Sequence, residues 1–154
     1  MTEPVENEDI ATFTCAFKSG AAGTFSVPRV AVGLPNSLGF EIFSESGAAQ
    51  FDLARTGEFV FADQAPAHAV NGYRRVLVGP EHPYIAGGLS MDFPSVNYGQ
   101  SDLFAFQARA FFEQVAAFAG LPPCPAFEDG VHNLKLLAAV AASAKARGTT
   151  VHIE

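Results

Sequence analysis

The chain has 154 residues, of which 49% are hydrophobic and 16% charged, and its formal net charge is −7 at pH 7. This length fits one domain with its own core, and the composition is that of a globular chain rather than a disordered one. The negative charge argues against nucleic acid as a partner, because phosphate binding needs clustered Lys and Arg, and the chain has only nine such residues. No apolar run approaches the roughly 18 residues of a membrane-spanning helix, so we predict no membrane segment.

The first half of the chain alternates between apolar and polar residues, which is typical of β-strands. Residues 1–8 form a polar lead-in, for which we predict flexibility. Six alternating stretches follow, most of them separated by short turns rich in Gly and Ser, and this spacing predicts an antiparallel meander. The predicted strands cover Ile10–Phe17, Phe25–Val27, Leu38–Ile42, Ala49–Leu53, Phe59–Phe61 and Tyr73–Val78.

The second half predicts two helices after a Gly- and Pro-rich loop that runs from Gly79 to about Gly99. Loops of this length in compact domains are often functional. Ser101 and Asp102 can cap the first helix. Its apolar residues recur at helical spacing: Phe104, Ala108, Phe111, Val115 and Phe118.

The second helix is predicted from Phe127 to Gly148, and its apolar residues lie on more than one side. Glu128 and Asp129 suit the positive end of the helix dipole, and Gly148 can supply a left-handed residue that ends the helix. A helix that is apolar most of the way round is covered on more than one side. A last short strand is expected at 149–153. This order predicts an α+β fold: an open, mainly antiparallel β-sheet with two long C-terminal helices on one face.

The residues that carry chemistry are few. Asp129 and His132 are three apart on the second helix, so they share a face, and a carboxylate beside an imidazole is a candidate acid–base pair. The simpler interpretation, which we favour, is that the carboxylates stabilise the helix start and His132 makes local contacts. Arg29, Arg74 and Arg75 are candidate anion ligands. No phosphate-binding loop is present, and no two histidines have metal-ligand spacing.

The two cysteines, Cys15 and Cys124, lie far apart in the sequence and form no Cys-x-x-Cys motif. We expect two buried, reduced thiols, as is usual for a cytosolic protein. The first nine residues are acidic and polar, unlike a signal peptide, so we expect a cytoplasmic protein.

Several segments of the sequence together form a recognisable series. They are Glu8–Ala11, Gly23–Gly33, Phe40–Ile42 with Gly47–Ala48, Gly79–Pro83, Tyr98–Asp102, Phe127–Leu134 and Val140–Ala144. This series resembles the C-terminal domain of the glucose–fructose oxidoreductase / inositol dehydrogenase / MocA (Gfo/Idh/MocA) family of NAD(P)-dependent oxidoreductases. No single motif carries the resemblance, but the segments follow the family's order over nearly the whole chain.

The resemblance implies that residues 9–154 are the substrate-side and oligomerisation domain of a larger oxidoreductase acting on CH–OH groups of a sugar or polyol. The family's N-terminal Rossmann domain is absent, as is the catalytic Lys of its Glu-Lys-Pro motif. In such a parent protein, NAD or NADP would bind outside this chain, and the missing domain would lie on the helix side. We expect no cofactor on this chain and no catalysis by the chain alone.

The same resemblance implies a homo-oligomer, a dimer or tetramer, formed through the sheet face. It also makes Arg29, His132 and Asn133 candidate substrate-binding residues. Two alternatives remain at this stage. One is a stand-alone dimeric module that binds a small ligand with the Gly79–Gly99 loop. The other is a small enzyme that uses Asp129 and His132 as an acid–base pair.

Overall fold

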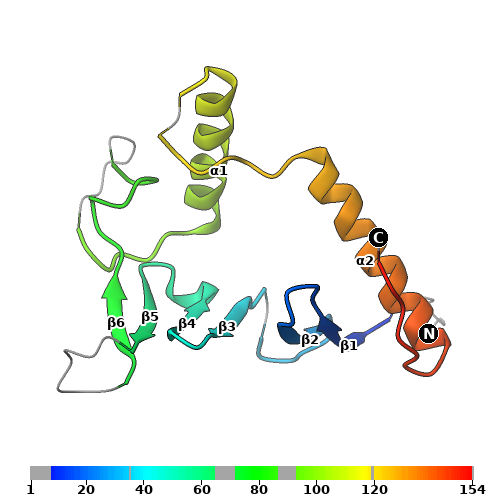
Figure 1. Ribbon diagram of the computed structural model, residues 1–154. Coiled ribbons are helices and arrows are strands. Elements are labelled where there is room, and N and C mark those ends of the chain that lie inside the picture. Colours follow the sequence, from blue (N-terminus) through cyan, green and yellow to red (C-terminus); the bar gives the residue numbers. More distant parts are fainter. Residues whose placement is uncertain (1–7, 35, 65–71, 87–92, 119, 154) are drawn as a thin grey trace, which may run out of the picture. The chain divides into compact units, whose positions relative to one another are not determined.

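The computed structural model describes residues 8–34, 36–64, 72–86, 93–118 and 120–153 (Figure 1). The chain divides into two compact units, which we describe separately. The first, the hairpin–helix unit, comprises Met1–Pro35 and Pro125–Glu154. The second, the meander unit, comprises Asn36–Cys124.

The hairpin–helix unit begins with two antiparallel strands, β1 (Ile10–Ala16) and β2 (Ala22–Pro28). The two strands are in register with Phe13 opposite Phe25, and these two rings stack with centroids 4.9 Å apart. The connecting turn is closed by the Phe17 N–H, which donates to the carbonyl of Ala21 (2.9 Å). Gly20 in this turn has φ +89°, a left-handed conformation that glycine adopts without strain.

The helix of this unit is α2 (Phe127–Lys145). It ends at Lys145, three residues before the predicted Gly148, because Arg147 (φ +58°) takes the left-handed position that closes the helix and donates its N–H to the Ala144 carbonyl (3.1 Å). Gly148 (φ +85°) follows as a second left-handed residue. One side of the helix is half-buried and carries Leu136, Ala139, Val140 and Ser143. The other apolar side is exposed and carries Phe127, Val131, Leu134 and Leu137. The prediction of two apolar sides is confirmed, and among the described residues one side is half-buried and the other is exposed.

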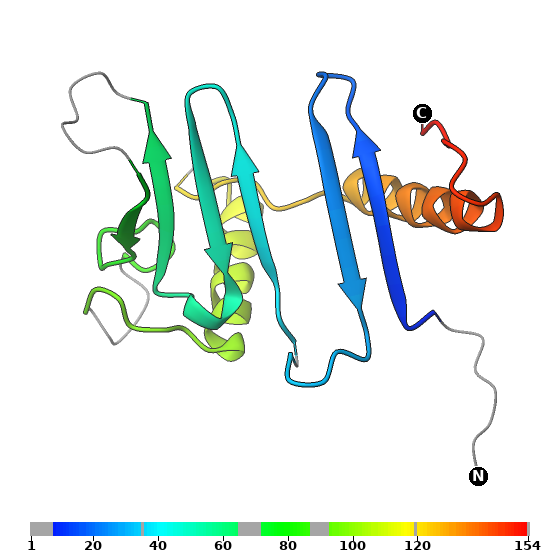
Figure 2. The ribbon, with the colours of Figure 1, turned by 90° about the horizontal axis from the view of Figure 1, so that it is seen from below.

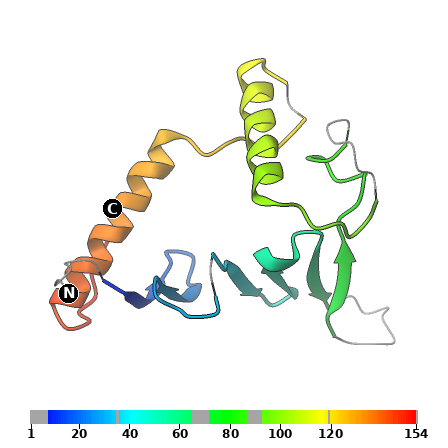
Figure 3. The same ribbon diagram turned by 180° about the vertical axis from the view of Figure 1, so that it is seen from behind.

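The meander unit contains four antiparallel strands, paired in the order in which they occur in the sequence. They are β3 (Gly39–Phe43), β4 (Gly47–Asp52), β5 (Glu58–Asp63) and β6 (Arg74–Leu77). A short 3₁₀ helix, η1 (Leu53–Arg55), joins β4 to β5. The helix α1 (Gln100–Val115) stands on one side of this sheet in all views (Figure 1, Figure 2 and Figure 3).

The core of the meander unit lies where α1 meets the loop before it. Ile85, Tyr98 and Ala110 are the buried apolar side chains among the described residues. Phe106 of α1 contacts both neighbouring tyrosines edge-on, with ring centroids 5.5 Å from Tyr98 and 6.3 Å from Tyr84. The side of α1 that meets this loop therefore carries Phe106 and Ala110, rather than the stripe of Phe104, Phe111 and Val115.

The α+β fold class and its open antiparallel strands are confirmed. The strands form two sheets, one of two strands and one of four, and β1 and β2 make up the smaller one. The expected strand at 149–153 is wrong, because this segment forms no ladder with any described residue. The lead-in at 1–7 and the central part of each long loop, 65–71 and 87–92, lie outside the described residues.

Two smaller predictions are corrected. Helix α1 begins at Gln100 with Gly99 as its N-cap, and Asp102 contributes by accepting a hydrogen bond from the Gly99 N–H (2.8 Å). Cys15 and Cys124 are free thiols, as predicted, but each is half-buried rather than buried. Among the described residues, neither helix combines the length and apolar character that a membrane crossing requires.

Candidate functional site

The start of α2 carries the residues that the sequence offers for acid–base chemistry. The carboxylate Oδ2 of Asp129 accepts a hydrogen bond from the backbone N–H of Ala126 (2.7 Å). This is half of a capping box, in which a side chain in the first turn satisfies a backbone donor just before the helix. In the described part of the chain, Asp129 and His132 share no hydrogen bond or ion pair. The capping interpretation is therefore the one that the geometry supports.

The three candidate substrate ligands all belong to the hairpin–helix unit and all are exposed. Arg29 follows β2, and its backbone N–H donates to the carbonyl of Asp9 (2.7 Å), which fixes its main chain beside β1. Its guanidinium forms no ion pair with a described residue. His132 and Asn133 are consecutive in α2, so their side chains leave the helix about 100° apart. None of the three is hydrogen-bonded to another in the described chain, and their role stays a prediction.

Arg74 and Arg75, by contrast, are engaged with neighbouring strands. Arg74 pairs with Asp63 (2.6 Å), and Arg75 pairs with Glu58 on the opposite face of the sheet. The alternation of the two arginines is confirmed. Because each guanidinium already has a carboxylate partner, neither is a free anion ligand.

Glu58 is the centre of a polar cluster that the sequence analysis missed. Its side chain is only about one-tenth exposed, yet it pairs with both Arg55 and Arg75. Arg75 also donates to the hydroxyl of Ser95 (3.2 Å), so the cluster joins β5 and β6 to the loop before α1. The sequence gives little indication of this cluster, because its members are isolated residues spread over 41 positions, from Arg55 to Ser95.

A second set of hydrogen bonds fixes the same loop. The Thr56 hydroxyl accepts from the Tyr98 N–H (2.6 Å) and donates to the Tyr98 carbonyl (2.9 Å). The Gly57 N–H donates to Oδ1 of Asn97 (3.2 Å). A side chain at Gly57 would meet the Val96 carbonyl oxygen at 2.6 Å, so the close approach of the two segments requires glycine.

The other part of the loop is held by Arg109 of α1. Its Nη1 donates to the carbonyls of Tyr84 (3.2 Å) and Ala86 (3.0 Å), while its Nε donates to Glu113 (2.7 Å). A planar guanidinium is suited to this task because it offers several donors in a fixed geometry. The loop that the sequence marks as functional is thus anchored on both sides of residues 87–92.

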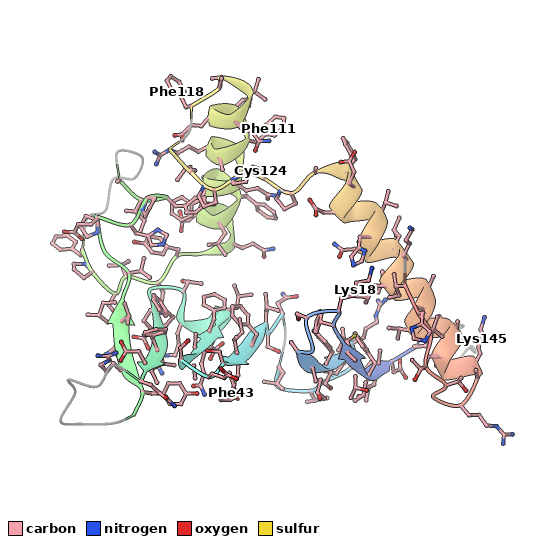
Figure 4. The ribbon with its side chains drawn as sticks, in the orientation of Figure 1. Lys18, Phe43, Phe111, Phe118, Cys124 and Lys145 are labelled. Atoms are coloured by element: carbon pink, nitrogen blue, oxygen red, sulfur yellow. The ribbon has the colours of Figure 1, made fainter. Side chains whose placement is uncertain are left out.

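Large apolar side chains are exposed along both helices. Those of α1 and the turn after it are Phe104, Phe111, Phe112, Val115 and Phe118, and Figure 4 shows Phe111 and Phe118 projecting from this segment. Phe118 is 70% exposed, and Phe127 at the start of α2 is 94% exposed. Among the described residues, no group of His, Cys, Asp and Glu is placed to hold a metal ion.

The fold matches solved oxidoreductases over nearly the whole chain. A crystal structure of an oxidoreductase domain protein from Kribbella flavida aligns with a TM-score of 0.81 and 33% identity, over 94% of this chain and 37% of that protein. The apo form of levoglucosan dehydrogenase aligns with a TM-score of 0.85 and 29% identity, over 98% of this chain and 38% of that enzyme. Its complex with NADH and levoglucosan gives a TM-score of 0.82 and 29% identity, over 93% of this chain and 38% of that enzyme. No protein-family model matches the chain.

These matches define the class. The chain corresponds to a partial, C-terminal-like region of oxidoreductases of the Gfo/Idh/MocA type, and the predicted resemblance is confirmed. Among characterised homologues is the levoglucosan dehydrogenase of Pseudarthrobacter phenanthrenivorans, which is 31% identical over 127 residues. That alignment covers 82% of this chain but 32% of the enzyme, so the chain spans about a third of this relative.

Proposed function

We propose that the chain is the C-terminal, substrate-side and oligomerisation portion of an NAD-dependent oxidoreductase acting on a sugar or polyol, and that it is not catalytic alone. The observation that carries this proposal is the similarity to levoglucosan dehydrogenase over 82% of the chain but only 32% of that enzyme. The hydride chemistry then belongs to the nicotinamide. NADH in solved complexes of this relative favours NAD over NADP in the parent protein.

Exposed apolar side chains support the proposal that this chain is one portion of a larger protein. Phe104, Phe111 and Val115 of α1 and Phe127, Leu134 and Leu137 of α2 are large apolar side chains that are each more than half exposed. Contiguous apolar patches of this kind mark interaction sites. We assign the exposed stripes of α1 and α2 to contacts with the nucleotide-binding domain of the parent protein.

The substrate-binding residues in this proposal are Arg29, His132 and Asn133. Guanidinium, imidazole and amide groups are suited to binding a polyhydroxylated substrate, because together they donate to and accept from hydroxyl groups. Each of the three is exposed, and none is tied up in a hydrogen bond to another side chain of the described chain. They are therefore available to a ligand.

The oligomer in this proposal is a dimer or tetramer formed through one face of the four-stranded sheet. Glu41, Gln50 and Val60 are neighbours in the register of β3, β4 and β5, and with Phe43 they make a face of mixed polarity. Antiparallel sheets often leave such a face for water or a partner. The proposal also places the parent protein in the cytoplasm, in keeping with the free thiols of Cys15 and Cys124.

A domain exchange tests the proposal. The corresponding portion of levoglucosan dehydrogenase is replaced by this chain, and the chimera is assayed for NADH binding by calorimetry and for NAD reduction with a panel of sugars, anhydrosugars and polyols. We expect turnover of at least one substrate, and a raised KM for it after Arg29→Ala or Asn133→Ala. A chimera that binds NADH but oxidises nothing on the panel would contradict the proposal.

Calorimetry on the chain alone provides the complementary test. We expect no heat of binding from NADH or NADPH, because the chain has no Gly-x-Gly-x-x-Gly segment to receive the pyrophosphate. Saturable micromolar binding would place the nucleotide site within these 154 residues. It would refute the proposal that the nucleotide binds to another domain of the parent protein.

A further inference from the structure

The outer edge of β1 offers hydrogen-bonding groups that the described chain does not use. Two bonds fix the pattern of the β1–β2 ladder: the Phe17 N–H donates to the Ala21 carbonyl, and the Arg29 N–H donates to the Asp9 carbonyl. Bonded pairs alternate along an antiparallel ladder, so the odd-numbered residues of β1 bond to β2. The N–H and C=O groups of Ile10, Thr12, Thr14 and Ala16 therefore point to the open edge, where no described residue pairs with them.

This edge lacks the features that normally protect an edge strand. Such strands are kept from pairing by charged side chains, proline or short length. The other outer strands have them: β2 ends in Pro28, β3 carries Glu41, and β6 consists of four residues that include two arginines. β1 has seven residues, Ile-Ala-Thr-Phe-Thr-Cys-Ala, with neither charge nor proline. An edge of this kind is a ready template for pairing with another strand.

The sequence of β1 is nearly symmetric about Phe13, and this symmetry suits a second copy of the same strand. Full antiparallel overlap of two copies places Phe13 opposite the partner's Phe13 and Thr12 opposite the partner's Thr14. It also places Ala11 opposite the partner's Cys15. The Thr12–Thr14 pair, and likewise Ile10 with Ala16, consists of residues whose backbone groups point outward, so both pairs can exchange hydrogen bonds. Because Phe13 already stacks on Phe25, the contact would extend one aromatic row through both copies.

The charges that flank β1 favour the same register. Full overlap of the two strands brings Glu8, just before β1, to the same end of the contact as the partner's Lys18, in the turn just after β1. Opposite charges close together attract each other, and an exposed pair contributes at most about 1 kcal/mol. A shift of two residues in either direction shortens the overlap of the two strands.

We propose that β1 is an interface between two copies of this chain, which pair antiparallel about Phe13 and join their two hairpins into one four-stranded sheet. This contact has its own two-fold axis and is distinct from the sheet-face contact of the proposed function. An isologous contact of this kind is self-complementary and closes after two copies. With a second, different two-fold contact, it would give a tetramer.

Cysteine cross-linking tests the register. Ala11 and the partner's Cys15 would form a pair without mutual hydrogen bonds, whose Cα atoms lie about 4.5 Å apart, within the range that a disulfide spans. In a Cys124→Ser background, Ala11→Cys should give a covalent dimer with oxidised glutathione, seen as a band of twice the mass on a non-reducing gel. The matched control, Ala11→Cys with Cys15→Ser, should stay monomeric, because the two residues at position 11 are far apart in this register. Equal cross-linking of both variants would refute the register, and absence of the dimer band from both would refute the interface.

Edge substitution tests the interface in another way. Thr14→Pro removes an outward N–H that β2 does not use, and Thr24→Pro makes the same change on the outer edge of β2, directly opposite Thr14 in the register. Light scattering at tens of micromolar should show at least two copies for the wild type and the same mass for Thr24→Pro. Thr14→Pro should dissociate about tenfold more readily, as expected for lost inter-strand hydrogen bonds. A wild-type mass of one chain, or equal effects of the two prolines, would overturn the proposal and leave this edge to a different strand of the parent protein.

Discussion

Replacement of Glu58 by glutamine tests whether its ion pairs stabilise the meander unit. Glu58 is the buried charged residue among those described, and its carboxylate is shared by Arg55 and Arg75. Glutamine keeps the size of the side chain and one acceptor oxygen but removes the charge. The substitution therefore isolates the charge-assisted part of these contacts.

The expected loss follows from the burial of the three partners. Removal of one partner from a fully buried ion pair costs about 3–5 kcal/mol, because the remaining charge has no compensation. Here the side chains of Arg55 and Arg75 are 61% and 56% exposed, so water solvates them once the carboxylate is gone. Exposed pairs contribute at most about 1 kcal/mol each. We therefore expect a destabilisation of about 1–2 kcal/mol, or a fall in Tm of roughly 2–8 °C for a domain of this size.

The assay is urea unfolding followed by circular dichroism, with Glu41→Gln as the matched control. Glu41 also sits on a strand and accepts a hydrogen bond from the Gln50 amide (2.9 Å), but it is exposed and pairs with no arginine. Its substitution should change the free energy of unfolding by less than about 0.5 kcal/mol. If Glu58→Gln is as mild as the control, the cluster contributes no net stability and the reasoning from burial is wrong.

The remaining predictions concern single substitutions. Gly57→Ala should destabilise the chain by about 1–3 kcal/mol in the same unfolding assay, because its new methyl group would meet the Val96 carbonyl oxygen at 2.6 Å. Gly130→Ala, which meets no atom within 4 Å inside α2, should instead stabilise it by about 0.5–1 kcal/mol. Arg109→Lys should speed hydrogen exchange of the Ile85 amide about tenfold, since one ammonium cannot replace three guanidinium bonds; unchanged exchange would show that the loop is held by other contacts. Asp129→Ala should cost about 0.5–2 kcal/mol and His132→Ala close to nothing, whereas equal costs would argue against the capping role.

The strands and helices could be predicted because they depend mainly on the pattern of neighbouring residues. Alternation located all six strands, and helical spacing with acidic residues at the start located α2. The strand expected at 149–153 failed for the opposite reason. An alternating stretch becomes a strand only where a partner strand receives its backbone bonds, and the partner is not visible in the stretch itself.

The polar clusters could not be predicted because their members are far apart in the chain. Glu58 and Ser95 meet Arg75 through the β5–β6 register and the return of the loop before α1, and no spacing rule joins them. Arg109 and Glu113 are four apart on a helix, so that pair was visible in the sequence, but its link to Tyr84 was not. Proximity along a helix is not sufficient evidence for a pair: Asp129 and His132 share a face, yet the Asp129 carboxylate accepts a hydrogen bond from the Ala126 N–H at the helix start, as the favoured interpretation predicts.

The stripe on α1 shows what periodicity leaves undetermined. Phe104, Phe111 and Val115 have the spacing of a core-facing surface, and in an isolated domain they would be assigned to its core. In the structure, α1 uses Phe106 and Ala110 for that purpose, and the stripe is exposed. A sequence indicates which apolar residues need burial, but it does not indicate whether they are buried by the same chain or by another domain or subunit. The exposed apolar stripes on both helices are the surfaces that the proposed larger protein would cover, and the relative with which the chain aligns is about three times as long as the aligned region.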